Sequence, residues 1–241
     1  MKTIGIIGAM EEEISQIRSR MELVQAKNIV GADYYIGKMR GQSVIAARSG
    51  VGKVNSAICA QVLIDLYAID YLVNVGVAGA VNRELNIGDV VVSKDAVHHD
   101  FDASVFGDPI GFIPRLDITY FPADPELIRA AEESGRAALD DEFCEAKLTP
   151  KVVVGRIATG DVFVSGEDRR QRIWQLFRAD CVEMEGAAIA QTCYLNRIPF
   201  VVVRTISDRS GAGADAEFRE FIGRAGAVAA NVIERMVERI Q

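Results

Sequence analysis

Short, continuously apolar runs alternate with longer stretches of helical spacing along the chain. The apolar runs predict strands at 4–7, 43–47, 71–75, 89–93, 152–158 and 199–206. Several of these runs lack a polar face, which is typical of strands that helices cover on both sides. Helical spacing predicts helices at 54–67, 125–139, 186–195 and 217–240. This alternation predicts an α/β fold with a parallel or mixed sheet.

Segment 100–124 follows neither pattern and is rich in proline, so we interpret it as a long ordered loop. No linker, low-complexity tract or internal repeat divides the sequence. We therefore expect residues 1–241 to form a single domain.

The composition is sufficient for a large hydrophobic core and argues against some classes of binding partner. The chain has 241 residues, 49% of them hydrophobic, and a net charge of −7. This charge argues against binding to nucleic acid or to anionic membranes. No apolar run reaches the roughly eighteen residues of a membrane span, and none at the N-terminus has the length of a secretory signal. The cysteines are scattered, as in reduced thiols of a cytoplasmic protein: Cys59, Cys144, Cys181 and Cys193.

Three acidic sites follow predicted strands, at the position where open α/β sheets bind ligands. The first is the triplet of glutamates at 11–13. If a helix begins near residue 10, its apolar stripe consists of Met10, Ile14, Ile17 and Met21. At about 100° per residue, Glu13 lies on the flank of this stripe, while Glu11 and Glu12 point away from it. Glu13 is therefore the acid expected to be partly buried; stabilisation of the helix dipole by first-turn acids is the alternative.

The second site is "VEMEGAA" at 182–188, where Glu183 and Glu185 bracket Met184. Carboxylates beside tightly packed small residues need partners, and the hydroxyls of a sugar diol suit them. A solvated turn is the alternative. The third site is Ser207 and Asp208, which end the last apolar run. A helix cap or a turn is the alternative there.

Taken together, the three carboxylate sites favour cleavage of a glycosidic bond. That reaction needs a proton donor for the leaving group, a carboxylate that activates water, and a means of holding a sugar with cationic character.

Other motifs give weaker signals. "RSGVGK" at 48–53 resembles a phosphate loop but is not a Walker A motif, because Val54 stands where Ser or Thr is required. Gly76 and Gly79 in "NVGVAGAV" allow the backbone to approach a flat ligand, without the third glycine of a dinucleotide fingerprint. For "HHDFD" at 98–102 we favour a loop hydrogen-bonded through its acids over a metal site, since adjacent histidines do not easily ligate one ion. Trp174 is expected to serve helix packing.

The order of these motifs resembles one known family. "IGIIGAMEEEI", "SGVGKVNSA", "GDVVVS", "HHDFD", "ATGDVFVSG", "VEMEGAAIAQ" and "PFVVVRTISD" follow one another as in the 5′-methylthioadenosine/S-adenosylhomocysteine nucleosidases, of the purine nucleoside phosphorylase superfamily. The likeness extends from Ile4 to Phe218. It implies one α/β domain with a mixed, partly barrel-like sheet flanked by helices, working as a homodimer. It also implies hydrolysis of the adenine–ribose bond of 5′-thio-substituted adenosines, without metal or organic cofactor.

The resemblance also implies roles for individual residues. Asp208, next to Ser207, would protonate purine N7, and Glu13 would position and deprotonate the attacking water, with Arg204 nearby. Glu185 and the Met184 backbone would bind the ribose hydroxyls, with Glu183 alongside. The remaining residues implied are Phe163, Val164, Ala78 and Gly79 around adenine, Met10, Val51 and Phe218 around the 5′-alkylthio group, and Phe106 and Pro114 from the partner subunit.

The sequence departs from this family at Val77, where a serine is usual, at Ala80, where a glycine is usual, and in the tail "SDRSGAGAD". Three other interpretations remain. A phosphorylase of the same fold is disfavoured, because Asn74 and Val77 replace an arginine and a serine there, and Glu13 would repel phosphate. A futalosine-type nucleosidase and a non-catalytic nucleoside-binding protein are the other two, although the latter would not need both Glu13 and Asp208.

Overall fold

A mixed sheet of ten strands forms the centre of the structure, a computed structural model that describes residues 2–143 and 150–240. The strands are β1 (Thr3–Gly8), β2 (Glu22–Ile29), β3 (Ala32–Met39), β4 (Gln42–Arg48), β5 (Tyr71–Ala80), β6 (Val90–His98), β7 (Phe121–Pro122), β8 (Val152–Thr159), β9 (Cys181–Glu183) and β10 (Phe200–Asp208). The helices are α1 (Glu11–Ser19), α2 (Lys53–Tyr67), α3 (Pro125–Phe143), α4 (Glu167–Phe177), α5 (Gly186–Asn196), α6 (Ala214–Arg239) and the short 3₁₀ helix η1 (Ser104–Phe106).

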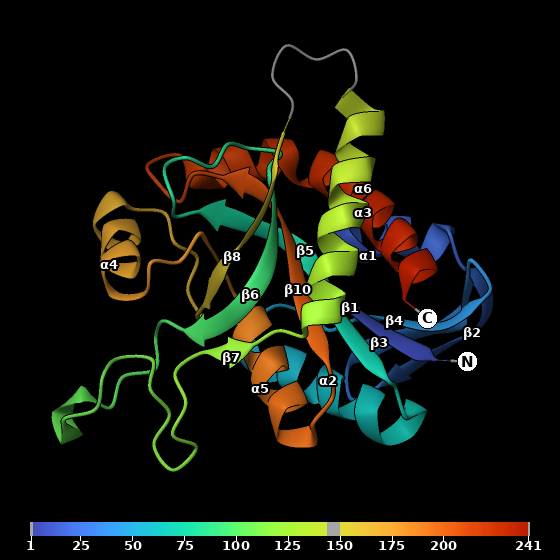
Figure 1. The fold of residues 1–241 in the computed structure, drawn as a ribbon, viewed down its shortest axis with the longest axis horizontal. Coiled ribbons are helices and arrows are strands. Elements are labelled where there is room, and N and C mark those ends of the chain that lie inside the picture. Colours follow the sequence, from blue (N-terminus) through green and yellow to red (C-terminus); the bar gives the residue numbers. More distant parts are fainter. Residues whose placement is uncertain (1, 144–149, 241) are drawn as a thin grey trace.

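Part of the sheet closes on itself. The strand order is β10-β6-β8-β9-β5-β1-β4-β3-β2, and β10 pairs with β5 as well as with β6. The strands β5, β10, β6, β8 and β9 therefore form a closed barrel-like ring, from which β1, β4, β3 and β2 continue as an open extension. This arrangement, with helices on both sides, confirms the expected α/β fold class (Figure 1).

Helices cover the sheet in two groups. Helices α2 and α5 pack together on one side, while α6 packs against both α1 and α3 on another (Figure 1). Burial along the strands varies: every residue of β10 is buried, whereas β6 and β8 each include exposed or half-buried residues. The predicted continuous burial of the apolar runs is thus confirmed for the strand that carries Asp208.

The predicted strands and helices are all present, with ends shifted by a few residues, and segment 100–124 is largely irregular apart from η1 and β7. The hairpin of β2 and β3 was not predicted. Strand β2 is exposed on nearly all its residues, so it has no apolar face to mark it. The tight turn at Val30 and Gly31, both with positive φ, fixes this hairpin.

The smaller expectations have mixed outcomes. Trp174 lies in α4 and packs partly buried against the neighbouring apolar cluster, as expected. Cys59, Cys181 and Cys193 are free and buried, whereas Cys144 lies outside the described residues.

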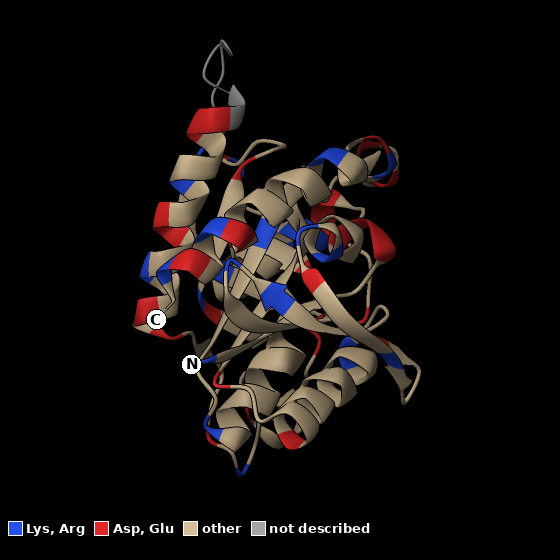
Figure 2. Ribbon diagram, turned by 90° about the vertical axis from the view of Figure 1, so that its right-hand side faces the viewer, with Lys and Arg blue, Asp and Glu red and all other residues tan. Residues whose placement is uncertain are grey.

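Acidic and basic residues are interspersed over the helices in view (Figure 2). In the described ranges, no helix combines the length and apolarity that crossing a membrane requires.

Candidate active site

One cavity of about 200 Å³ lies where β1, β5, β9 and β10 end, beside the loop after β8 and the start of α6. Within the described ranges its lining is Ala9, Met10, Glu13, Val51, Val77, Ala78, Gly79, Val162, Phe163, Val164, Val182, Glu183, Met184, Glu185, Ser207, Asp208, Ser210 and Phe218. This described lining contains four carboxylates and neither a lysine nor an arginine.

The cavity brings together most of the residues singled out in the sequence. Glu13 and Asp208 share it, although 195 positions of sequence separate them, and Glu183 and Glu185 line it as well. Arg204 is not part of the lining but lies behind these acids. Phe106 and Pro114 do not border the cavity in the single chain, and Phe106 is 85% exposed. Their predicted role in a second copy of the chain stays a prediction.

Glu13 turns inward, as the helical periodicity predicts. The side chain is buried, whereas Glu12 is exposed and Glu11 half-buried. Its Oε2 accepts hydrogen bonds from the N–H groups of Ala9 (2.7 Å) and Met10 (3.0 Å), and its Oε1 accepts one from the Val77 N–H (3.1 Å). These bonds cap the first turn of α1, so the alternative of helix stabilisation describes part of its role.

Burial raises the pKa of Glu13, and two effects oppose this rise. The positive charge of Arg204 lowers the pKa, and so do the backbone N–H groups bonded to the carboxylate. A carboxylate held in this way has a fixed orientation and an adjacent cation. It is suited to remain ionised and to accept a proton from a water molecule.

Arg204 is fully buried and organises the acids around it. Its Nη2 donates to Asn74 Oδ1 (2.5 Å) and pairs with Glu183, while Glu185 Oε2 lies 4.0 Å away. Asn74 is itself fixed, because its Nδ2 donates to the Ile7 carbonyl (2.9 Å). Burial by itself would lower the pKa of this guanidinium, but the surrounding carboxylates raise it. The guanidinium is therefore a permanent charge at the centre of an acidic cluster.

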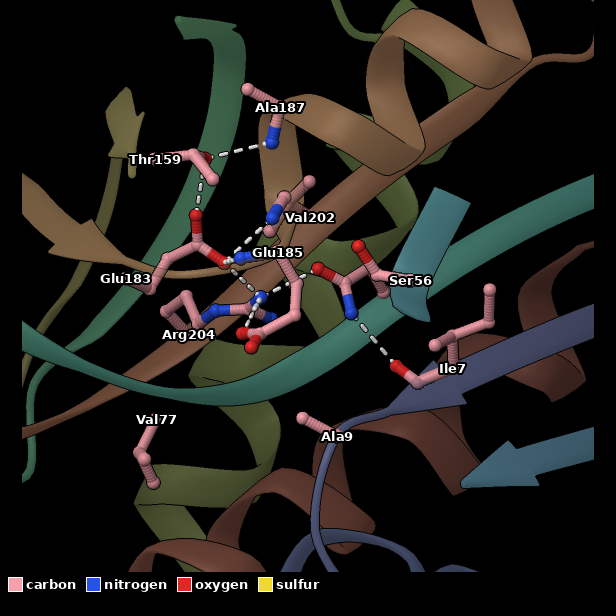
Figure 3. Close-up of polar contacts among 12 residues, drawn as sticks. Ile7, Ala9, Ser56, Val77, Thr159, Glu183, Glu185, Ala187, Val202 and Arg204 are labelled. Carbon is pink, nitrogen blue, oxygen red and sulfur yellow. Dashed lines mark hydrogen bonds and ion pairs between the residues drawn. The ribbon is translucent and has the colours of Figure 1, made fainter. Parts of the chain in front are cut away.

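Glu183 has little capacity left for a ligand. Its oxygens accept hydrogen bonds from the N–H groups of Glu185 (3.0 Å) and Gly186 (2.7 Å), and also from the Thr159 hydroxyl and Arg204 (Figure 3). These contacts place the carboxylate at the N-terminus of α5, where a negative charge is favourable. The alternative of a solvated turn at 182–188 is wrong, because Glu183 and Glu185 are both buried. Glu183 holds Arg204 and the start of α5 in place.

Glu185 has more freedom. Its Oε1 accepts a hydrogen bond from the Gly52 N–H (2.8 Å), and its Oε2 lies 4.0 Å from Arg204 Nη2, the nitrogen that also pairs with Glu183. Burial, followed by the negative charge of Glu183, raises the pKa of Glu185 well above its usual range, while Arg204 lowers it. A positive charge that develops next to Glu185 would relieve this repulsion.

Asp208 lines the cavity beside Gly79, three residues along β5 from the glycine that contacts Glu13. Its Oδ1 accepts a hydrogen bond from the Ser210 N–H (2.8 Å), so the turn alternative is also correct. Its Oδ2 accepts one from the Ser207 hydroxyl (2.9 Å), which also lies 3.3 Å from the Ala78 carbonyl. Burial raises the pKa of Asp208, and these two hydrogen bonds lower it. The Ser207 hydroxyl has a second acceptor in Ala78, so it can stay hydrogen-bonded when Asp208 carries a proton.

The two glycines of β5 make room for these carboxylates. A Cβ atom on Gly76 would lie 2.5 Å from Glu13 Oε1, and one on Gly79 would lie 2.7 Å from Asp208 Oδ1. A bulge between β10 and β5, near Ile206, then shifts the register so that Asp208 pairs with Gly79. The glycines were predicted for close approach to a ligand; the structure shows that their immediate neighbours are catalytic-type side chains.

Much of the remaining cavity wall is apolar. Phe163 and Phe218 meet edge to face with ring centroids 5.8 Å apart, and Met10, Val51, Val77 and Val164 complete this surface. An apolar wall with a carboxylate at each end suits a ligand that has a flat, apolar body and polar groups on two sides.

Some residues of the site were not identified in the sequence. Ser210 lines the cavity with a buried hydroxyl that has no hydrogen-bond partner among the described residues. Thr159 holds Glu183 and accepts a hydrogen bond from the Ala187 N–H (2.7 Å). Asn74 interrupts a buried apolar run, and a polar residue at such a place is a usable signal for a functional contact. Thr159 and Ser210 give no comparable signal, because hydroxyl residues are common in turns.

The acids of the histidine-containing loop are hydrogen-bonded, as favoured above, although the partners of Asp100 come from other loops. Lys53 Nζ donates to both oxygens of Asp100 (2.7 and 2.8 Å), and Asp102 accepts from the Ser104 N–H (2.9 Å). Within the described residues, no group of three or more His, Cys, Asp or Glu side chains is arranged to hold a metal ion.

Three comparisons relate this geometry to known proteins. Residues 3–238 match the model of the phosphorylase superfamily. The chain is 37% identical over 238 residues to a 5′-methylthioadenosine/S-adenosylhomocysteine nucleosidase of Staphylococcus epidermidis, covering 98% of this chain and 100% of the relative. It also resembles the solved structure of such a nucleosidase from Neisseria meningitidis in complex with methylthio-immucillin-A, with a TM-score of 0.91, 36% identity and 99% of each chain covered. A futalosine hydrolase structure from Helicobacter pylori is similar at a TM-score of 0.90 and 30% identity, and both chains are covered completely.

Proposed function

Because the chain belongs to the phosphorylase superfamily, and within it to the 5′-methylthioadenosine/S-adenosylhomocysteine nucleosidases, we propose that it hydrolyses the N-glycosidic bond of these two nucleosides. The products would be adenine and the 5′-thio-substituted ribose. One observation carries the proposal: Glu13 and Asp208 line a single cavity, beside glycines three residues apart on β5, and much of the rest of its lining is apolar. This is the arrangement that a leaving purine and an incoming water require.

In the proposed reaction Asp208 is the general acid. Protonation of purine N7 turns adenine into a better leaving group, and a well-placed acid contributes roughly 10²–10⁴ in rate. The raised pKa of Asp208 supports this role, because it favours the protonated form that can donate. Ser207 would follow the change by turning its hydroxyl from the carboxylate to the Ala78 carbonyl.

At the other end, Glu13 would take a proton from water while the ribose gains positive charge. Glu183 and Glu185 line the same cavity, and among the described residues Arg204 is the cation paired with them. A cationic sugar is therefore stabilised more strongly than a neutral one, which lowers the barrier rather than only binding the substrate. Glu185 and the Met184 backbone would bind the ribose hydroxyls.

The remaining residues would bind the two ends of the nucleoside. Phe163 would stack on adenine, and the Val164 backbone would read its amino edge, next to Ala78 and Gly79. Met10, Val51 and Phe218 would surround the 5′-alkylthio group. No cofactor takes part in this scheme.

We further propose a homodimer in which Phe106 and Pro114 of the second copy close the 5′ end of the cavity. Phe106 and Val105 are each 85% exposed on η1, and large apolar residues such as Val54 and Leu195 are exposed on α2 and α5. Figure 1 shows η1 projecting away from the body of the chain. A second copy would cover this apolar surface.

The proposed setting is methionine salvage in the cytoplasm, with residues 1–241 acting as one domain. The one continuous sheet and the unpaired cysteines of the described chain support this interpretation. A net charge of −7 gives no reason to expect a nucleic-acid or membrane partner.

Phosphorolysis is less compatible with the site. A phosphate ion needs cationic and N–H donors, yet the described lining has four carboxylates and no basic side chain. The similarity to a futalosine hydrolase keeps futalosine as a second substrate to test.

The decisive assay is adenine release from 5′-methylthioadenosine and S-adenosylhomocysteine in phosphate-free buffer. The expected result is release without phosphate, at a rate about 100-fold lower in a Glu13→Gln preparation purified in the same way. A strict need for phosphate would indicate a phosphorylase. Turnover of futalosine alone would assign the other nucleosidase activity, and no turnover of any of the three would leave a nucleoside-binding protein.

A further inference from the structure

The loop at 49–53, which resembles a phosphate loop, binds carboxylates of the chain itself. Gly50 and Gly52 have φ values of 82° and 99°, which only glycine adopts readily. The N–H of Gly52 donates to Glu185 (2.8 Å) and the N–H of Lys53 donates to Asp161 Oδ1 (2.8 Å). The Lys53 ammonium binds Asp100. The sequence pattern correctly indicates an anion-binding loop, but its anions are internal side chains.

Three of these residues form a closed ring of hydrogen bonds. Lys53 Nζ donates to Asp100 (2.7 and 2.8 Å), the Asp161 N–H donates to Asp100 Oδ2 (2.9 Å), and Asp161 accepts the Lys53 N–H. The ring joins three separate loops, which follow β4, β6 and β8. Helix α2 has no side-chain cap of its own and no acid in its first turn, so Asp161 supplies the anion at its N-terminus.

The ring of hydrogen bonds is linked to the cavity through Gly52, which binds the cavity residue Glu185. Gly52 immediately precedes Lys53, and its N–H is the one backbone donor that the described structure gives to the Glu185 carboxylate. A Cβ on Gly52 would lie 3.2 Å from Asp161 Oδ1, so the loop and Asp161 are in close contact. Val51 lies two residues before Lys53, and Phe163 lies two residues after Asp161. Both residues line the cavity.

We propose that Lys53 is a positioning residue for catalysis: together with Asp100 and Asp161 it holds the loop at 49–53 so that the Gly52 N–H orients Glu185 toward the ribose hydroxyls. This inference rests on the function proposed above. Lys53 and Asp100 are partly exposed, with 23% and 28% of their side-chain surface accessible, so their pairing is a weak source of stability. The effect of the Lys53–Asp100 pair is to place the Gly52 N–H, which fixes one rotamer of Glu185.

The test compares Lys53→Met with Lys2→Met, a matched control at a lysine paired with Asp70 outside the cavity. In Lys53→Met, amide hydrogen exchange at Gly52, followed by NMR, should accelerate at least tenfold, and kcat/KM for 5′-methylthioadenosine should fall about tenfold. The acidic limb of the pH profile of kcat/KM should move to higher pH. The Gly52 hydrogen bond lowers the pKa of Glu185, so losing it keeps Glu185 protonated to a higher pH. Lys2→Met should change none of these quantities.

A double-mutant cycle separates positioning from general damage. If Lys53 acts through Glu185, adding Lys53→Met to a Glu185→Gln enzyme should lower kcat/KM less than twofold further. An equal loss in both backgrounds, or an unmoved pH limb, overturns the inference. Lys53→Arg should recover most of the activity, and Asp100→Asn should reproduce Lys53→Met if the latter folds poorly. Unchanged exchange at Gly52 contradicts the positioning role whatever the activity, whereas a parent enzyme without nucleosidase activity contradicts only the function proposed above.

Discussion

The two acidic ends of the cavity differ in how their carboxylates are held. At the ribose end, Glu13 accepts three backbone N–H groups and has the buried Arg204 nearby. At the purine end, Asp208 accepts one backbone N–H and the Ser207 hydroxyl, and within the described part of the chain no lysine or arginine pairs with it. Burial raises the pKa of both acids, but only Glu13 has a cation that opposes the rise.

This difference supports the two chemical roles proposed above. An acid with a neighbouring cation and several fixed donors is suited to stay ionised, and an acid with a single flexible hydroxyl partner is suited to carry a proton. The fold achieves this with similar residues, since both carboxylates lie against glycines of β5. The following substitutions test whether the ends differ in this way.

The largest effect is expected from Asp208→Asn, which removes the proton donor at the purine end. An amide cannot protonate N7, so kcat for 5′-methylthioadenosine should fall by about 10²–10⁴. Steady-state adenine release measures the change, with Asp168→Asn, an exposed aspartate of α4, as the control. Activity within threefold of the parent would refute the role of Asp208.

The next largest effect is expected at the ribose end, from Glu13→Gln. The amide has no charge to accept a proton from water, and its NH₂ group would face backbone donors, so kcat should fall about 100-fold. KM should change much less, because the residue does not hold the purine. Glu12→Gln is the matched control, since Glu12 is the exposed neighbour in the same helix. Equal effects of the two substitutions would show that Glu13 has no special function.

The inward position of Glu13 could be predicted because it depends on local periodicity alone. One helical stripe decides which of three consecutive glutamates is buried, and the structure agrees. Four strands of the ring, β5, β6, β8 and β10, were predicted from their continuous apolar runs, whereas the three-residue strand β9 was not.

The part played by Glu183 could not be predicted, because its partners come from distant strands. Thr159 ends β8 and Arg204 lies within β10, and only the closed ring brings both to the start of α5. The hairpin of β2 and β3 was missed for another reason: its exposed outer strand is defined by pairing and by a turn, not by apolar spacing.

A smaller effect is expected from Ser207→Ala at the purine end. The Ser207 hydrogen bond lowers the pKa of Asp208, so its loss should raise that pKa. Asp208 acts in its protonated form, and the basic limb of the pH profile of kcat/KM should therefore move to higher pH. The lost hydrogen bond, worth about 1 kcal/mol, should also lower kcat/KM roughly fivefold. The same substitution at the exposed Ser19 should change neither quantity, and an unmoved or lowered basic limb would contradict the assignment.

The smallest effect is expected from Phe106→Ala, which leaves both acidic ends intact and removes only the proposed closure of the 5′ side. Loss of an apolar contact to the methylthio group, about 1 kcal/mol, should lower kcat/KM for 5′-methylthioadenosine roughly threefold to fivefold, and leave adenosine, which lacks that group, unaffected. Pro114→Ala should act in the same direction, whereas Val24→Ala, at a 79% exposed valine of β2, should have no effect.

Mixing two defective enzymes decides where Phe106 acts. In a mixed dimer of Phe106→Ala and Asp208→Asn chains, the acid-competent cavity is closed by the intact Phe106 of the other chain. The preference for 5′-methylthioadenosine over adenosine should therefore return toward that of the parent. If Phe106 acts within its own chain, the only competent cavities still lack it, and the preference stays reduced. If Phe106→Ala does not change the preference for 5′-methylthioadenosine over adenosine, the proposal of a shared site is contradicted. The contrast between Glu13 and Asp208 would not be affected.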